Sequence, residues 1–124
     1  MLPQKQTIFG EGGNCFSACI ASICDLPLSE VPVFGEHGYW YFEVIDFLHR
    51  HGFVIHGKIM KESFPLWYKH YEGVDGYFIV GGGSPRMIKN GHAVIYKEDT
   101  PFFDPHPDDT FLTKEEEVYL IKKI

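Results

Sequence analysis

The sequence predicts an α+β domain in which a central, buried N-terminal helix packs on an antiparallel sheet formed by the C-terminal half. Two observations lead to this prediction. Helix-type periodicity is confined to residues 1–51, whereas from residue 53 onwards the apolar residues form short strand-type runs separated by turn residues. The 124 residues fit a single domain, 1–124, that can bury a core without a disulfide or metal staple.

The first helix is predicted from Cys15 to about Cys24, after an irregular segment over residues 1–14. This stretch is apolar nearly all round, and its only polar side chains, Ser17 and Ser22, are small. Such a helix is usually buried in the middle of a domain. Asn14 precedes it and is a residue type whose side-chain oxygen often caps a helix N-terminus.

The second helix is predicted from Tyr39 to His51, before Gly52, which favours a helix end. Its apolar and charged side chains occupy opposite faces, the pattern of a helix packed on one side. The apolar face holds Trp40, Val44, Phe47 and Leu48, and the charged face holds Glu43, Asp46 and Arg50. The predicted strands cover residues 53–57, 76–80, 92–96, 101–104 and 118–124, with 113–119 interpreted as a charged connector into the last strand.

Composition argues against several classes of partner. The formal net charge is −6 and the basic residues are scattered, which disfavours nucleic acid. No apolar run approaches the ~18 residues that span a bilayer, so no membrane partner is expected. The first ten residues lack the apolar segment of a secretory leader, and the three cysteines do not look like a disulfide framework. A reducing, cytoplasmic location fits these features best.

Cys15 is the candidate nucleophile among the three cysteines. It stands at the first turn of its helix, where unpaired backbone N–H groups lower the pKa of a thiol and can stabilise an oxyanion. Cys19 and Cys24 lie inside the helix and at its far end. The alternative is that Cys15 is one more small apolar residue, because free cysteines are often buried.

His92 is the candidate base among seven histidines, because it opens the apolar strand "HAVIY" directly after a glycine. Asp104 follows twelve residues later, at the predicted end of the next antiparallel strand, where its carboxylate could orient the imidazole. The alternatives are a core histidine bonded to a backbone carbonyl and a turn aspartate before Pro105.

The order Cys15, His92, Asp104, with the cysteine heading a buried helix and the histidine a later strand, resembles that of the papain-like cysteine peptidases. Within that superfamily the chain is similar to small members such as the bacteriocin-leader peptidases of export transporters. It is also similar to small uncharacterised bacterial and phage proteins that carry a cysteine helix, an "SPR" loop, "HAV" and "DPHP". The resemblance implies a papain-like fold, a bacterial or phage-infected cytoplasm, and a glutamine oxyanion donor. Gln6 matches that glutamine best, with Gln4 as the alternative.

The resemblance implies a thiol-dependent hydrolase, a peptidase or amidase, or an acyl transferase, which acts through a thioester on a peptide or small amide-containing substrate. Asn14, Ser84 and Arg86 are expected to contact that substrate, although a solvated loop charge also explains Arg86. No cofactor is expected, and no metal, because the cysteines lack Cys-x-x-Cys spacing. The alternative function is a non-catalytic binding or inhibitory protein on the same scaffold, phage-encoded and acting on a host macromolecule. The oligomeric state stays open.

Overall fold

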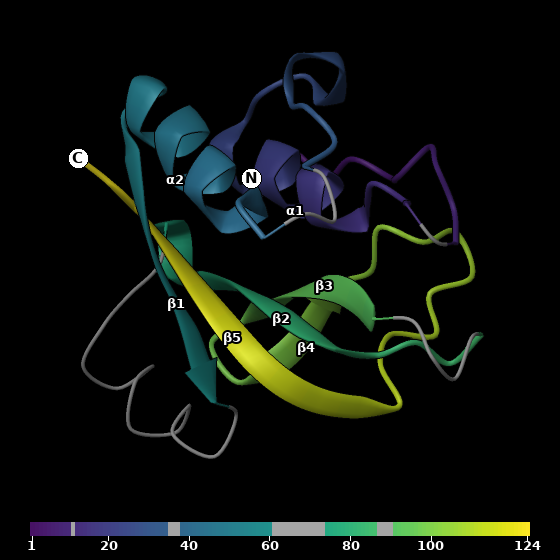
Figure 1. Ribbon diagram of the computed structural model, residues 1–124. Coiled ribbons are helices and arrows are strands. Elements are labelled where there is room, and N and C mark those ends of the chain that lie inside the picture. The colour runs from purple at the N-terminus through teal and green to yellow at the C-terminus, as the bar shows by residue number, and fades with distance from the viewer. Residues whose placement is uncertain (11, 35–37, 61–73, 87–90) are drawn as a thin grey trace.

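The computed structural model describes residues 1–10, 12–34, 38–60, 74–86 and 91–124. Two α-helices in this part of the chain cover one face of a five-stranded antiparallel sheet (Figure 1). The helices are α1 (Cys15–Cys24) and α2 (Trp40–Arg50), and the strands are β1 (Phe53–Met60), β2 (Tyr77–Gly83), β3 (Gly91–Lys97), β4 (Thr100–Phe103) and β5 (Lys114–Lys123). The strand order is β1-β5-β2-β3-β4. The predicted α+β class with a buried N-terminal helix is confirmed.

Helix α1 has the predicted bounds and is buried from Ser17 to Cys24. Its cysteine, alanine and serine side chains are small, so the helix can lie close to β3 and β2, against which it packs. Asn14 occupies the predicted N-cap position, but its side chain makes no capping bond. Its Oδ1 instead accepts the N–H groups of Thr7 and Ile8, both at 2.9 Å, because the N-terminal segment runs back alongside the helix.

Helix α2 packs on β1 through the predicted apolar face. Val44, Phe47 and Leu48 are buried, and Trp40 is half-buried. The helix is one residue shorter at each end than predicted, because Tyr39 and His51 take the capping positions. No helix within the described ranges combines the length and the apolar character required to cross a membrane.

Strand β5 begins earlier than predicted. Lys114, Glu115 and Glu117 pair with Gly83, Gly82 and Gly81 of β2, and Glu117 also pairs with Met60 of β1. The interpretation of 113–119 as a connector was therefore wrong for 114–119. Strands pair through their backbone groups, so charged side chains do not prevent pairing. They do, however, remove the alternating apolar pattern by which a strand is recognised in a sequence.

Two apolar clusters enclose the sheet. The larger lies between the helices and the sheet and includes Ile20, Leu48, Ile79, Ile95 and Tyr119. The smaller lies on the opposite face and is formed by Phe78, Val80, Val94, Tyr96, Val118 and Leu120, with Phe111 and Leu112 packed against it. The strands β2, β3 and β5 supply both clusters from alternate residues, so the middle of the sheet is buried on both faces.

Gly57 in β1 is required by the packing of the larger cluster. A Cβ atom built at this position would lie 2.5 Å from a ring carbon of Tyr119, whose side chain is buried. The hydroxyl of Tyr41 also donates to the Gly57 carbonyl at 3.1 Å. The Tyr119 ring therefore occupies the place where the side chain of any other residue would stand, and Tyr41 binds the carbonyl of the same residue.

Replacing Gly57 by alanine is expected to lower the free energy of unfolding by roughly 1–3 kcal/mol, the usual cost of overpacking a core. Urea unfolding followed by fluorescence measures it. Gly38→Ala is the matched control, because no atom lies within 4 Å of a Cβ at that position. Equal stability of the two variants would contradict this account of Gly57.

Candidate active site

The thiol of Cys15 stands at the start of α1, on a half-buried side chain. The first backbone N–H groups of an α-helix have no partner within the helix, so they face the space beyond this end. The Cys15 thiol is close enough to the His92 imidazole, which comes from the sheet, to raise the pKa of that ring through a hydrogen bond and through charge. A helix side chain and a strand side chain thus meet at one point.

His92 is the second residue of β3, and Asp104 directly follows β4. These strands form an antiparallel hairpin in which Ile95 pairs with Phe103, so the two side chains come together at the open end of the hairpin. The His92 Nε2 lies 2.7 Å from Asp104 Oδ1. Both residues are buried, with exposed fractions of 6% and 0%.

The carboxylate of Asp104 is satisfied by three donors. Besides His92, the backbone N–H of His106 donates to Oδ1 at 2.9 Å, and that of Phe111 donates to Oδ2 at 2.8 Å. Burial alone raises the pKa of this carboxyl, but the three hydrogen bonds outweigh it and hold the pKa below its ordinary value. Asp104 is therefore ionised at neutral pH despite its burial.

The imidazole of His92 is held in its charged form. Burial by itself lowers its pKa, but the hydrogen bonds to Asp104 and Cys15, together with the negative charges of both groups, raise it to about 9. Because Nε2 faces Asp104, the other ring nitrogen, Nδ1, is the one left for the thiol. A proton held there can be given to a group beside the sulfur.

The two candidate glutamines occupy opposite ends of α1. Gln6 is buried, and its Nε2 donates to the carbonyl of Ile8 at 3.0 Å. The same carbonyl accepts the N–H of Asn14 at 3.2 Å, so the Gln6 amide lies beside the start of the helix. Gln4 instead bonds to the Leu26 carbonyl and the Leu28 N–H, beyond the end of the helix. Of the two, only Gln6 is placed near Cys15.

The three expected substrate contacts have partners within the protein. The Asn14 amide is buried and bonds to Thr7 through Nδ2 and to the N-terminal segment through Oδ1. Ser84 Oγ accepts the N–H of Arg86 at 3.3 Å. The Nη1 of Arg86 donates to both carboxylate oxygens of Asp108 at 2.8 Å. Arg86 therefore joins the β2–β3 connection to the segment that follows β4.

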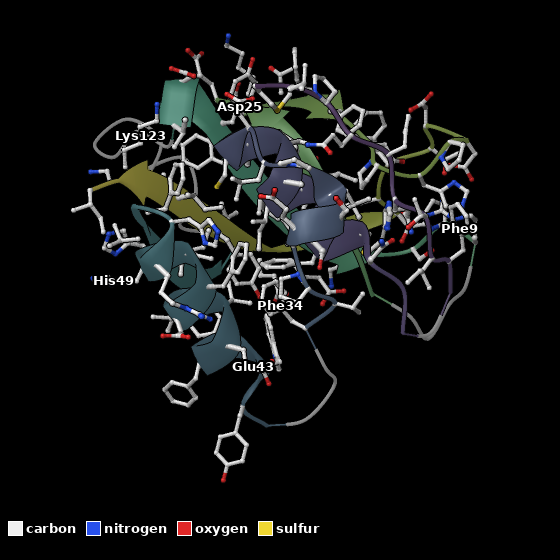
Figure 2. All side chains as sticks on the ribbon, turned by 90° about the horizontal axis from the view of Figure 1, so that it is seen from above. Phe9, Asp25, Phe34, Glu43, His49 and Lys123 are labelled. Atoms are coloured by element: carbon white, nitrogen blue, oxygen red, sulfur yellow. The ribbon has the colours of Figure 1, made fainter. Side chains whose placement is uncertain are left out.

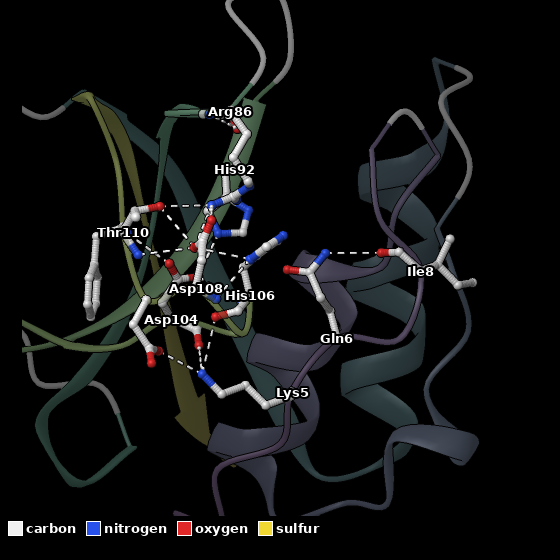
Figure 3. A network of polar contacts seen from close by, with 12 residues as sticks. Lys5, Gln6, Ile8, Arg86, His92, Asp104, His106, Asp108 and Thr110 are labelled. Atoms are coloured by element: carbon white, nitrogen blue, oxygen red, sulfur yellow. Dashed lines mark hydrogen bonds and ion pairs between the residues drawn. The ribbon is translucent and has the colours of Figure 1, made fainter.

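Two further residues, His106 and Lys5, lie beside His92 and Asp104 (Figure 3). The ring of His106 lies 6.3 Å from that of His92, centroid to centroid, and its Nδ1 accepts the N–H of Asp108. The ammonium of Lys5 bonds to the carbonyls of Asp104 and His106 and to Asp109 Oδ1. No local sequence pattern indicates the role of Lys5, because its partners lie about a hundred residues away.

The other two cysteines differ from Cys15 in their surroundings. Cys19 has no solvent exposure, and burial, together with the charges of Cys15 and Asp104, raises the pKa of its thiol. Burial and the nearby Asp25 raise the pKa of Cys24 to about 12, against a smaller opposing effect of Lys123. Within the described residues no group of three or more histidine, cysteine, aspartate or glutamate side chains is arranged to hold a metal ion.

Comparison of the chain with protein-family models, with curated protein sequences and with solved structures finds no match.

The raised pKa of His92 predicts that the free energy of unfolding decreases as the pH rises above neutral. The folded imidazole has a pKa of about 9, against an unfolded value of about 6.5. Its contribution to the free energy of unfolding is therefore fully present below about pH 6.5 and is lost as the pH rises through 9. Urea unfolding from pH 6 to 10 measures this loss.

His92→Gln is expected to flatten the profile over this range, because glutamine can donate to Asp104 but does not titrate. His49→Gln, at an exposed position on α2, should keep the wild-type profile. A wild-type profile that stays flat between pH 7 and 10 would show that His92 is not held as an imidazolium.

Proposed function

We propose that the chain is a thiol-dependent hydrolase, a peptidase or amidase, or an acyl transferase, with Cys15 as nucleophile, His92 as acid and base, and Asp104 as the group that orients the imidazole. One observation carries the proposal. A buried imidazole, 2.7 Å from a buried carboxylate, is also within hydrogen-bonding reach of a thiol at a helix N-terminus. The substrate would be a peptide or a small compound that contains an amide.

The first half of the reaction makes a thioester. The Cys15 thiolate attacks the carbonyl carbon, and the carbonyl π electrons move to the oxygen. When the tetrahedral adduct collapses, the C–N bond breaks and the amine leaves with the proton that His92 held. Proton transfer of this kind contributes ~10²–10⁴-fold.

The second half releases the acyl group. Water, or an amine in a transferase, attacks the thioester carbon while His92 takes its proton. The C–S bond then breaks, the acid or new amide departs, and the proton returns to the thiol–imidazole pair. Asp104 stays ionised throughout and holds Nε2, so the same nitrogen of His92 faces the sulfur in both halves.

The oxyanion would be stabilised by the backbone N–H of Cys15 and by Gln6. The placement of the Gln6 amide beside the start of α1 supports this role. Its Nε2 carries two protons, one of which is donated to Ile8, and the second is the one proposed for the oxyanion. One such donor is typically worth ~10²–10³-fold in rate.

The papain-like assignment belongs to this proposal. It is supported by the cysteine at the head of a buried helix, by the histidine at the start of a sheet strand, and by the carboxylate at the end of the next strand. A bacterial or phage-infected cytoplasm is proposed with it. The contrasting function is a binding or inhibitory protein in which these residues do no chemistry.

The pH dependence of Cys15 alkylation by iodoacetamide tests the proposal without a known substrate. A thiolate–imidazolium pair should label rapidly below pH 7, whereas an ordinary thiol labels only as the pH nears its pKa of about 8.5. Peptide mass spectrometry distinguishes Cys15 from Cys19 and Cys24, whose raised pKa values should keep them slow.

His92→Ala should remove the rapid labelling, and Cys15→Ser should remove all turnover in a screen of peptide and amide substrates. His49→Ala is the control, because that side chain lies on the exposed face of α2. Labelling that rises only near pH 8.5, or that is indifferent to His92, would favour the binding function. A partner complex that survives Cys15→Ala would then be the expected finding.

A further inference from the structure

The N-terminal segment lies along α1 in the opposite direction to the helix. It begins beside the helix C-terminal end, where the N–H of Leu2 and that of Gln4 bond to Ser22 at 3.2 and 2.9 Å. It ends beside the helix N-terminus, where Asn14 holds the N–H groups of Thr7 and Ile8. The segment is therefore attached to α1 on both sides of Lys5 and Gln6.

Lys5 and Gln6 also attach this segment to the segment that follows β4. The N–H of Gln6 donates to the Pro105 carbonyl at 2.9 Å. The Lys5 Nζ donates to the carbonyl of Asp104 at 2.8 Å, to that of His106 at 3.2 Å, and to Asp109 Oδ1 at 2.7 Å. An ammonium has three protons, and here each has an acceptor. The ring of Phe9, in the N-terminal segment, packs edge-on against that of His106, in the segment that follows β4. Seen from above, Phe9 lies at the opposite edge of the molecule from Lys123 and His49 (Figure 2).

The position of Lys5 matters because the proposed triad is divided between these two parts of the molecule. Cys15 belongs to the helix, whereas His92 belongs to β3 and Asp104 directly follows β4. Asp104 is held by His92 through its carboxylate and by Lys5 through its carbonyl. The distance from sulfur to imidazole thus depends on the packing of α1 against β3 and on how closely the N-terminal segment along α1 is held to residues 104–109.

We propose that Lys5 is a positioning residue that sets the distance between the Cys15 thiol and the His92–Asp104 pair, by joining the segment bound to α1 to the backbone of Asp104. This inference rests on the proposed function. Lys5 touches neither the substrate nor the reacting atoms, so its effect is indirect. Its side chain is 43% exposed, so its ion pair with Asp109 adds little to overall stability. The ammonium acts by fixing the position of the Asp104 backbone relative to the segment bound to α1.

Lys5→Met tests the inference, because methionine keeps an unbranched side chain beside the Phe103 ring but lacks the ammonium that lies over it. The rate of Cys15 alkylation at pH 6 is expected to fall about tenfold or more, since small displacements of reacting groups have effects of this size. The alkylation profile should shift towards pH 8.5, that of an ordinary thiol, while the urea midpoint stays close to the wild-type value. A residue with a merely structural role would move the midpoint and leave the pH profile in place.

Lys97→Met is the matched control. Lys97 also lies over an aromatic ring, with Nζ 5.1 Å from the centroid of Tyr77, but it stands at the far end of β3 from His92. Its alkylation profile should equal that of the wild type. Lys5→Arg, which keeps a cation with several donors, should recover part of the lost rate. Asp109→Asn, which leaves the two carbonyl acceptors in place, should cause a smaller fall in the same direction and serves if Lys5→Met does not fold.

The outcomes separate this inference from the proposed function. Rapid labelling in the wild type that persists unchanged in Lys5→Met, or in Asp109→Asn if that variant has to serve, would overturn the role of Lys5 and leave the triad standing. An equal fall in Lys97→Met would overturn it too, because the effect would then follow from any lost cation. If wild-type Cys15 labels only near pH 8.5, the proposed function fails and the role of Lys5 fails with it.

Discussion

The burial of an ionised Asp104 is the constraint on which the rest of the site depends. A carboxylate withdrawn from water has to recover its lost hydration through donors within the protein. Asp104 recovers it from one imidazole and two backbone N–H groups, those of His106 and Phe111. These donors come from β3 and from the segment after β4, so the carboxylate fixes the path of that segment around itself. The same bond, together with the Cys15 thiol, raises the pKa of His92.

The path of residues 104–111 is also fixed from outside. Arg86 bonds to Asp108 and Thr110 from the β2–β3 connection, and Lys5 bonds to Asp109 from the N-terminal segment. Both ion pairs are partly exposed, so each is a modest source of stability. Their physical importance is that two separate parts of the chain, the β2–β3 connection and the N-terminal segment, converge on the residues that hold Asp104.

The small residues of α1 allow this convergence. A helix with large side chains would stand further from β3, whereas Ala18, Cys19 and Ala21 have no exposed surface and take little volume. The helix can therefore bring its first residue within reach of His92 at the start of the strand. Phe16 points the other way, packing edge-on against Trp40 and Tyr119. Adjacent residues of one helix turn thus serve the site and the core.

Local patterns explain which parts were predictable from the sequence. The bounds of α1 follow from an uninterrupted small and apolar stretch. The contact of His92 with Asp104 follows from a hairpin that brings together two residues twelve positions apart. The charged start of β5 left no pattern, because its pairing depends on backbone groups alone. Likewise, no local pattern indicates that Lys5 bonds to Asp104, 99 residues away. Contacts of that range depend on how whole elements pack, which periodicity does not encode.

Gln6, by contrast, is oriented by a contact close to it in the sequence, the carbonyl of Ile8. Its Oε1 is buried and has no hydrogen-bond partner within the described structure, which typically costs about 1–3 kcal/mol. Rotating the amide by half a turn would not relieve that cost. Oε1 would then take the place of Nε2, which now donates a hydrogen bond to the Ile8 carbonyl oxygen at 3.0 Å, and two oxygens would face each other. Repulsion between two oxygens is worse than one unpaired acceptor, so the NH₂ group stays at the helix start. The unpaired oxygen is therefore the consequence of an amide whose donor side is held on the Ile8 carbonyl.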